Sequence, residues 1–469
     1  MFAIIDFFSG LGEKLTRVTE RWIPDAWIVC MILTAISIVL AVFGAGATPQ
    51  EAVMAWGGGM WLLLELAMQF TIALVASHAI VSSPPIYKLL DRLASMPNPE
   101  RPFQAVALMC FYSIFTGYLN WALTIVASAL FVPFTCRRNP RTGIRILIVA
   151  AYLGICTVWH GGLSASAPLI MATPGNPLLA PATGTAVVDR LIPVTETLFN
   201  SFNIIYMLVI SMVAIVAVVA LHPRRNPVTL SPEQAEALLP KLPEPESLAS
   251  MSPRRHMDRF QGWILLAVVL ILYPLGYNIF THPDGLAAGF GANWTINAYN
   301  VVFLSAALAL HGRPESLLKV IPHGVVTASG VILQFPFYAG IFGVMNNTGL
   351  GSWLGELFVS ISTTGTYPLI VYCYSGFVNL FVPSGGSKWL IEAPYLLPAA
   401  KELGVSTVTT VLAYGYGDST SNLIQPFWAL PILTVTRVRF GDVLGYTFLV
   451  GTILFLTTVV FMLMIPSQL

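Results

Sequence analysis

The sequence is poor in charged residues. Asp, Glu, Lys and Arg make up only 10% of its 469 residues, whereas a soluble domain carries about 25%. The 23 basic and 22 acidic side chains nearly cancel and leave a formal net charge of +1. Such a balance provides no strongly basic surface for a polyanion. We therefore expect no nucleic-acid partner.

Paired cysteines and common catalytic signatures are also missing. The five cysteines stand singly, and no CxxC motif suggests zinc binding or redox chemistry. There is no phosphate-binding glycine pattern, which argues against ATP-driven pumping, and no GxSxG motif. His160 and Ser164 lie four residues apart, but no orienting acid is near them in the sequence. We expect neither an enzyme nor a cofactor, apart from a coupling ion.

Apolar residues, in contrast, make up 56% of the chain and occur in long blocks with few charges. A helix needs about 20 apolar residues to cross the bilayer core, where it satisfies its own backbone groups. The sequence therefore predicts an all-α polytopic membrane protein of about eleven spans. The clearest blocks are 28–42, 61–76, 204–221, 264–275 and 446–465.

Polar segments divide these blocks into domains. Residues 1–22 lack the apolar stretch of a cleavable signal and are predicted to form an amphipathic segment on the membrane surface. Residues 222–260 are rich in proline and charge, which favours a cytoplasmic linker. The predicted membrane parts are a first repeat at 23–221, a connecting span at 261–282 and a second repeat at 296–469.

The two halves share short motifs in the same order. Residues 117–128 match 376–387 without a gap, which pairs Asn120 with Asn379. Two weaker matches flank this one, 68–70 with 333–335 and 162–167 with 417–422. Their common order indicates an internal repeat.

Charge in the loops predicts that the repeats are inverted. The loop at 136–145 contains four arginines, whereas the equivalent loop at 398–404 contains only Lys401 and Glu402. Because positive charge marks cytoplasmic loops, the first loop is expected inside, together with the N-terminus, and the second outside. Inverted repeats of this kind are typical of secondary transporters.

Each repeat contains an apolar segment that suits a re-entrant hairpin, at 103–134 and at 367–397. Their turns are expected at 119–124 and at 382–387, where Pro383 and two glycines break the helix. Non-helical backbone at membrane depth must be lined by protein or water. Its free N–H groups suit an anion, and its carbonyls suit a cation.

Lys388 follows the second turn directly. A lysine at the bilayer centre costs about 2.5–3.5 kcal/mol, so it needs a partner. Glu392 one turn further on, Asp418 and a substrate carboxylate are the three candidates.

A second polar stretch, 415–426, interrupts an apolar run and is expected to be unwound. Its oxygens suit sodium, and Asp418 could neutralise that ion, carry a proton or serve only as the partner of Lys388. The first-half equivalent, 160–168, lacks an acid, and His160 is either a proton carrier or a structural histidine. The role of Glu65, within another apolar run, stays open.

These motifs resemble a known family. Asn379-x-x-x-Pro-Ser-Gly-Gly-Ser387, Gly417-Asp418 and Asn422-x-x-x-Pro426 are similar to motifs of the ion transporter superfamily of carboxylate carriers and antiporters. Within it the chain most resembles the short-chain fatty acid transporter family, with acetoacetate and butyrate among the proposed substrates. The resemblance covers nearly the whole length. It implies an elevator-type carrier with two opposed hairpins and two broken helices around a central site, cation coupling and a homodimer.

The resemblance also implies the site residues. The substrate-binding residues would be Asn379, Ser384, Gly385, Gly386, Ser387, Lys388, Asn120 and Thr124. The cation-binding residues would be Asp418, Ser419, Thr420, Ser421, Asn422, Ser164 and Ser166. Dicarboxylate members have a Ser-Asn-Thr turn in both hairpins, whereas the first turn here is Trp121-Ala-Leu-Thr124. A site with one polar turn suits a molecule with one carboxylate and a short apolar tail.

The sequence thus predicts a secondary active transporter of small monocarboxylates in the cell inner (plasma) membrane, coupled to sodium or protons. A cation/proton antiporter with Asp418 as the exchanging acid is the first alternative. An intramembrane hydrolase using Ser164 or Ser384 is the second.

Overall fold

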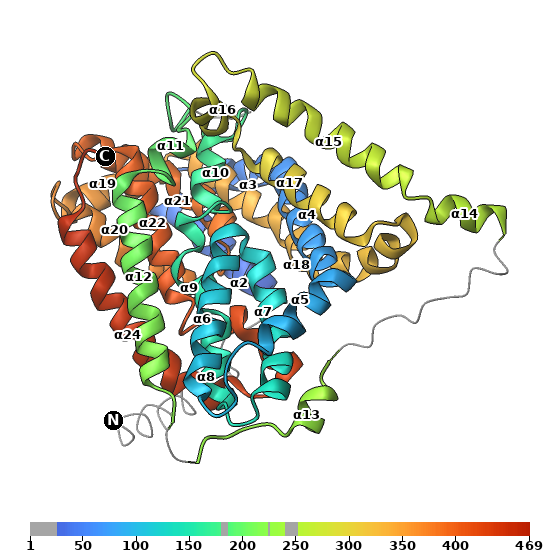
Figure 1. Cartoon of the computed structure of the whole chain (residues 1–469). Coiled ribbons are helices and arrows are strands. Elements are labelled where there is room, and N and C mark those ends of the chain that lie inside the picture. The colour runs from blue at the N-terminus through green and yellow to red at the C-terminus, as the bar shows by residue number, and fades with distance from the viewer. Residues whose placement is uncertain (1–25, 180–185, 224–225, 240–251) are drawn as a thin grey trace.

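A computed structural model describes residues 26–179, 186–223, 226–239 and 252–469, and these residues form helices without any strand (Figure 1). The expected all-helical class is thereby confirmed. The amphipathic segment predicted at 1–22 lies outside the described residues.

The first half contains short and long helices in alternation. They are α2 (Ala26–Phe43), α3 (Pro49–Gly59), α4 (Leu64–Val81), α5 (Pro84–Ala94), α6 (Pro102–Leu119), α7 (Trp121–Arg138), α8 (Ile144–Ala151), α9 (Leu153–Thr157), η1 (Trp159–Gly161), α10 (Ser166–Ala172), α11 (Val194–Thr197) and α12 (Ser201–Ala220). The central part holds α13 (Pro232–Glu236), α14 (Pro253–Arg259) and α15 (Gly262–Phe280).

The second half is arranged in the same way. Its helices are α16 (Leu286–Asn293), α17 (Ile296–His311), α18 (Pro314–Asn347), α19 (Leu350–Ile361), α20 (Tyr367–Asn379), α21 (Gly385–Glu402), α22 (Thr407–Ser421), η3 (Pro426–Ala429), α23 (Leu430–Thr436) and α24 (Phe440–Met464). A long helix, a shorter one, a helix pair, a broken helix and a final apolar helix follow one another in both halves. In the first half these are α4, α5, α6 with α7, α8 to α10, and α12. In the second they are α18, α19, α20 with α21, α22 with α23, and α24.

Several of these helices suit a bilayer. In the part of the chain that the structure describes, six helical segments are long and apolar enough to cross a membrane, and three shorter apolar helices accompany them. The six are Leu64–Val81, Pro102–Leu119, Ser201–Ala220, Pro253–Phe280, Pro314–Asn347 and Phe440–Met464. The total of about eleven spans stays a prediction from apolar length.

The helices pack in two groups. In one, α18 lies along α2, α3 and α4, and α17 also lies along α4. In the other, α20 lies beside α22, α6 beside α7 and α9, and α12 beside α24. Figure 1 shows α4, α17 and α18 on the right, α12, α20, α22 and α24 on the left, and α15 at the upper right margin. Contacts of α4 with α7 join the groups.

The described part of the linker docks on the base of the first helix pair. Glu236 of α13 accepts a hydrogen bond from Arg137 at 2.5 Å, and Asp91 of α5 pairs with Arg137 and Arg138 at 2.5 and 2.7 Å. The hydrogen bond from Arg138, with further help from Arg137, lowers the pKa of Asp91 below its ordinary value. The arginine-rich loop therefore also holds the linker.

One expected feature is placed differently. The stretch 415–426 was expected to be unwound, yet α22 continues through Asp418 to Ser421, and the break comes only at residues 422–425. Gly415 and Gly417 allow close packing instead. A Cβ at Gly417 would lie 2.2 Å from the Tyr372 carbonyl oxygen, and one at Gly415 would lie 2.9 Å from His160 Cβ. The prediction therefore holds for residues 422–425 and is wrong for 415–421, because glycine marks close backbone approach as well as turns.

Candidate functional site

The first helix pair turns at one residue. Asn120 has an extended backbone (φ −160°, ψ 119°) between α6 and α7. Its side-chain oxygen accepts hydrogen bonds from the backbone N–H groups of Ala122 and Leu123, both at 2.9 Å. This is an N-cap, which satisfies donors that the helix leaves free. Asn120 thus begins α7, and Thr124 in its first turn donates to the Ser113 carbonyl oxygen at 2.9 Å.

The second turn is longer and packs against the first half of the chain. Residues 380–384 separate α20 from α21, and the Ser387 hydroxyl donates to that of Ser384 at 2.5 Å. A Cβ at Gly385 would lie 2.4 Å from His160 Nε2, and one at Gly386 would lie 2.7 Å from the ring of Phe70. Side chains at the two glycines would push the turn away from the centre of the molecule.

Each turn is bound to the broken helix of its own half. In the first half, the Trp121 N–H donates to the Ser164 hydroxyl at 2.9 Å. In the second, the Asn379 amide donates to the Ser421 hydroxyl at 2.9 Å and to the Asn422 side-chain oxygen at 2.6 Å. Helix pair and broken helix therefore form one connected unit in each half.

The two broken helices also contact each other. The Asn422 amide donates to the Ile155 carbonyl oxygen at 2.9 Å, and the Tyr152 hydroxyl donates to the Leu423 carbonyl oxygen at 3.1 Å. Residues about 270 positions apart in the chain thus meet at the breaks.

A charged cluster lies at this crossing. Lys388 Nζ is 2.8 Å from Asp418 Oδ1, and His160 Nε2 is 3.0 Å from Asp418 Oδ2. Lys388 also donates to the carbonyl and the hydroxyl of Ser375, at 2.8 and 2.9 Å, and lies 4.7 Å from the Tyr414 ring centroid. Of the three partners considered for Lys388, the structure shows Asp418. Among the described residues, no ion pair joins Lys388 to Glu392.

The cluster is closed to solvent. Lys388 and Asp418 have no exposed surface, and His160 is 1% exposed. A buried ion pair must recover a desolvation cost of several kcal/mol per ion, and here the carboxylate and the ammonium each have two partners. In this conformation the charged cluster is therefore closed to water on both sides of the membrane.

Three tryptophans form an apolar wall beside the cluster. Trp121, Trp159 and Trp428 lie with ring centroids 5.7–6.0 Å apart. Trp159 also contacts His160, with centroids 4.1 Å apart. Sequence reasoning missed this group, although Trp121 in the first turn was a signal. We call Trp121, Trp159 and Trp428 the tryptophan wall.

Most predicted cation ligands already make hydrogen bonds within the protein. Thr420 donates to the Tyr416 carbonyl oxygen and Ser421 to that of Gly417, both at 2.9 Å. The Ser419 hydroxyl is buried without a hydrogen-bond partner among the described residues, and Ser166 is buried at the start of α10. In that part of the chain, no group of three or more His, Cys, Asp or Glu side chains could hold a metal.

Glu65 lies outside the cluster. Its side chain is exposed on α4 and accepts a hydrogen bond from Gln69 at 3.3 Å. Gln69 in turn donates to Asn297 of α17 at 2.9 Å. Glu65 therefore belongs to the packing of α4 against α17.

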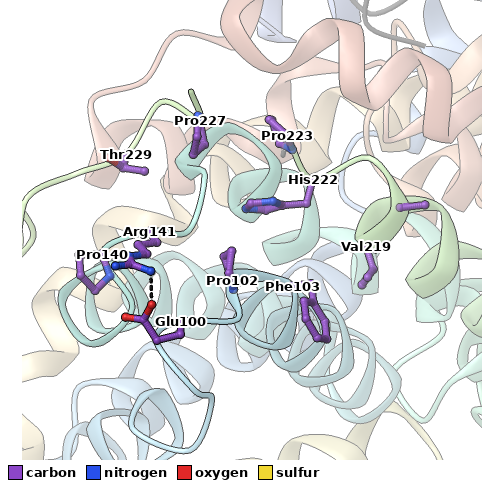
Figure 2. Close-up of a pocket in the computed structure, with 11 residues that line it drawn as sticks. Glu100, Pro102, Phe103, Pro140, Arg141, Val219, His222, Pro223, Pro227 and Thr229 are labelled. Atoms are coloured by element: carbon purple, nitrogen blue, oxygen red, sulfur yellow. Dashed lines mark hydrogen bonds and ion pairs between the residues drawn. The ribbon is translucent and has the colours of Figure 1, made fainter. Parts of the chain in front are cut away.

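A cavity of about 770 Å³ lies in a different place, between the base of the first helix pair and the end of α12 (Figure 2). An ion pair between Arg141 and Glu100 crosses it, and Phe103 and His222 contribute to its wall. None of its lining residues belongs to the charged cluster.

Known proteins resemble this chain over nearly its full length. Residues 7–466 match the family model described as short chain fatty acid transporter. A protein of Escherichia coli (strain K12) is 33% identical over 436 residues, which cover 93% of this chain and 95% of the relative. One of Haemophilus influenzae is 30% identical over 449 residues, with 93% and 95% covered. Both are assigned by name to the short-chain fatty acid transporters.

Two solved structures share the fold. The YdaH transporter of Alcanivorax borkumensis superposes with a TM-score of 0.61 at 16% identity, covering 94% of this chain and 98% of its own. MtrF of Neisseria gonorrhoeae, from a class of antimetabolite efflux pumps, gives 0.55 at 13% identity, with 96% and 97% covered. At these identities the likeness concerns the fold alone.

Proposed function

Because this chain belongs to the short chain fatty acid transporter family, we propose that it is a secondary active transporter of small monocarboxylates. Its substrates are short-chain fatty acids and related acids of the acetoacetate and butyrate class. It works as a multi-pass protein of the cell inner (plasma) membrane, with a cytoplasmic N-terminus.

The arrangement of Lys388 beside the tryptophan wall carries this proposal. Lys388 lies in the first turn of α21, where the positive end of the helix and free N–H groups favour an anion. Trp159 reaches the same turn, because its ring lies 2.9 Å from the position of a Cβ on Gly385. A carboxylate on the α21 side and a short apolar tail against the tryptophans match the chemistry of a small monocarboxylate.

Charge balance supports cation coupling. Asp418 already neutralises Lys388 at 2.8 Å. An incoming carboxylate therefore adds one uncompensated negative charge to a site without water, which is costly. One cation per substrate restores neutrality, and the transport step is then electroneutral.

A proton suits this site better than sodium. Sodium requires several free oxygens, whereas the Ser421 oxygen accepts a hydrogen bond from the Asn379 amide and the Thr420 hydroxyl pairs with that of Tyr372. Titratable groups are present in the closed region, in His160, Asp418 and Glu392. Sodium is the second candidate for the coupling ion.

Alternating access would move the connected unit of helix pairs and broken helices against α4, α17 and α18. An elevator movement of this kind would carry the closed cluster between the two sides while the packed group around α18 stays in place. We propose a homodimer as the working assembly.

Uptake by proteoliposomes tests the proposed function. Labelled acetoacetate and butyrate are offered under a pH gradient or a sodium gradient, with protein-free liposomes subtracted because neutral acids cross lipid unaided. Uptake that butyrate inhibits better than succinate is expected. Stronger inhibition by succinate would contradict the single-carboxylate site.

The same preparation separates the alternatives. Cation/proton exchange without any carboxylate uptake would indicate the antiporter. If uptake is unchanged in the double variant Ser384→Ala, Lys388→Ala, these residues do not belong to the transport site.

A further inference from the structure

We infer that Glu392 is the residue that binds the coupling proton, one helical turn beyond the charged cluster. This inference rests on the proposed function, because it names the ion and its site for the same transport reaction. It is based on the surroundings of the Glu392 carboxyl group.

Glu392 is buried without a hydrogen-bond partner in the part of the chain that the structure describes. Its side chain is 1% exposed, and neither carboxyl oxygen has a partner among the described residues. Buried carboxylates are otherwise paired or hydrogen-bonded, as Asp418 is. An isolated carboxylate in such a place is so costly that the group takes up a proton instead. The closed conformation therefore holds Glu392 as the neutral acid.

The groups that face Glu392 leave it without a cation of its own. Lys388 is four residues away on the same face of α21, about 6 Å along the axis, but Asp418 holds it at 2.8 Å. The other charged group whose field reaches Glu392 is Asp418 itself. Lys388 thus lies near two acids, Asp418 and Glu392, and forms its ion pair with Asp418.

The remaining neighbours are tyrosines and apolar side chains. Tyr374 and Tyr395 lie within electrostatic range of Glu392, and their hydroxyls bond to each other at 2.8 Å. Tyr414 of α22 lies within the same range, but its hydroxyl donates to the Gly385 carbonyl oxygen at 2.7 Å.

The other helices that pack on α21 add no buried charge. The stretch of α18 at residues 324–347 contains no charged residue, nor does α10. Glu356 of α19 is exposed. No helix packed against α21 thus brings a second buried cation to Glu392.

The position of Glu392 gives it access to water when the site opens. Pro394 and Pro398 lie within α21 just beyond it, and each removes a backbone hydrogen bond. This end of α21 leads to the loop that the charge pattern places outside. A proton enters there on one carboxylate oxygen of Glu392 and leaves from the same oxygen after the unit has moved.

This assignment separates the roles of the three acid–base groups. Asp418 stays ionised because Lys388 and His160 occupy both of its oxygens. Glu392 is ionised while the site is open and empty and takes up one proton with each carboxylate, so the sum of charges in the site is the same with and without substrate. His160 positions Asp418.

The test compares driven accumulation with exchange in Glu392→Gln. A pH gradient of about one unit supports about tenfold accumulation when one proton moves per substrate. Glu392→Gln, a neutral isostere of the acid, should lose this accumulation while it still exchanges labelled for unlabelled acetoacetate. Glu356→Gln, the same change at an exposed position of α19, should keep both.

Infrared difference spectra of the purified protein provide a second measurement. A carboxylic acid band should be present in the wild type, absent in Glu392→Gln and shifted in Glu392→Asp. Full pH-driven accumulation by Glu392→Gln, or no acid band from Glu392 in the wild type, would overturn the inference. If the wild type carries no monocarboxylate, the proposed function fails, while the band still decides whether Glu392 holds a proton.

Discussion

His160 from the first half of the chain and Asp418 from the second meet at 3.0 Å, where the two broken helices cross. Because Asp418 also holds Lys388 at 2.8 Å, its carboxylate connects both halves and the second turn. These contacts explain how the charged side chains of Lys388 and Asp418 can be fully buried. Because Asp418 contacts both other residues, substitution of Asp418 should have a larger effect than substitution of His160.

Asp418→Asn should be the most damaging change in the cluster. It leaves Lys388 buried without a counter-charge, which costs about 3–5 kcal/mol. Transport should be lost, and the melting temperature of the purified protein in detergent should fall. The double variant Asp418→Asn, Lys388→Met removes both charges and should melt higher than Asp418→Asn alone. A single variant as stable as the wild type would contradict the buried ion pair.

His160→Gln should have a smaller effect on stability, because Lys388 remains with Asp418. Loss of the hydrogen bond to the carboxylate should cost about 1.5–3 kcal/mol, and uptake should fall by more than about tenfold if the barrier rises by a similar energy. His256→Gln is a suitable control, because this histidine is exposed on α14. Wild-type uptake by His160→Gln would show that the link between the halves is dispensable.

Gly417→Ala should disrupt the packing of α20 against α22. The added Cβ would lie 2.2 Å from the Tyr372 carbonyl oxygen, which is backbone and cannot move alone. Overpacking of this kind costs about 1–3 kcal/mol or more. Gly276→Ala in α15 is the matched control, because nothing lies within 4 Å of its added Cβ. It should be neutral or slightly stabilising, and thermal unfolding of both variants provides the comparison.

The sequence predicted the structure correctly where helix-breaking residues mark a turn and where a charge in an apolar segment requires a partner. Asn120 and Asn379 were paired by the repeat, and both lie at the turn of a helix pair. Lys388 needed a partner for energetic reasons, which limited the candidates to three. The all-helical membrane fold followed from long apolar blocks. In each case the prediction depends on properties of a short segment, such as its apolar length, its helix breakers or a buried charge.

Contacts between distant segments could not be predicted in the same way. His160 and Asp418 are 258 residues apart, and no local pattern signals their hydrogen bond. The tryptophan wall combines three separate segments. The unwinding expected at Gly417 was wrong because the residue's close neighbour, Tyr372, is on another helix. The isolation of Glu392 is likewise visible only in three dimensions.

Asp91→Asn should weaken the attachment of α5 to Arg137 and Arg138 in a pH-dependent way. The pKa of Asp91 is lower in the folded protein, chiefly through the hydrogen bond from Arg138. Its stabilising effect is therefore complete above the unfolded pKa of about 3.9 and is lost as the pH falls through the folded value. For a partly exposed pair this effect is about 1 kcal/mol or less. The melting difference between wild type and variant should be present at neutral pH and shrink on strong acidification, whereas a constant difference would contradict the ionic role.

Trp121→Ala should change which acids the protein prefers. Trp121, Trp159 and Trp428 are 7%, 2% and 8% exposed, so the wall is closely packed. In the proposed site it would set the length of the tail that fits beside Lys388. Removing one indole leaves space for further methylene groups, each worth about 1–3 kcal/mol in an apolar pocket. Hexanoate should then compete better against labelled acetoacetate than butyrate does, the reverse of the order expected for the wild type. Phe103→Ala, at the cavity of Figure 2, should leave the order unchanged, because that residue lies outside the cluster. An unchanged order in Trp121→Ala would mean that the tail lies elsewhere, and Lys388 would then need a different apolar neighbour to account for a monocarboxylate.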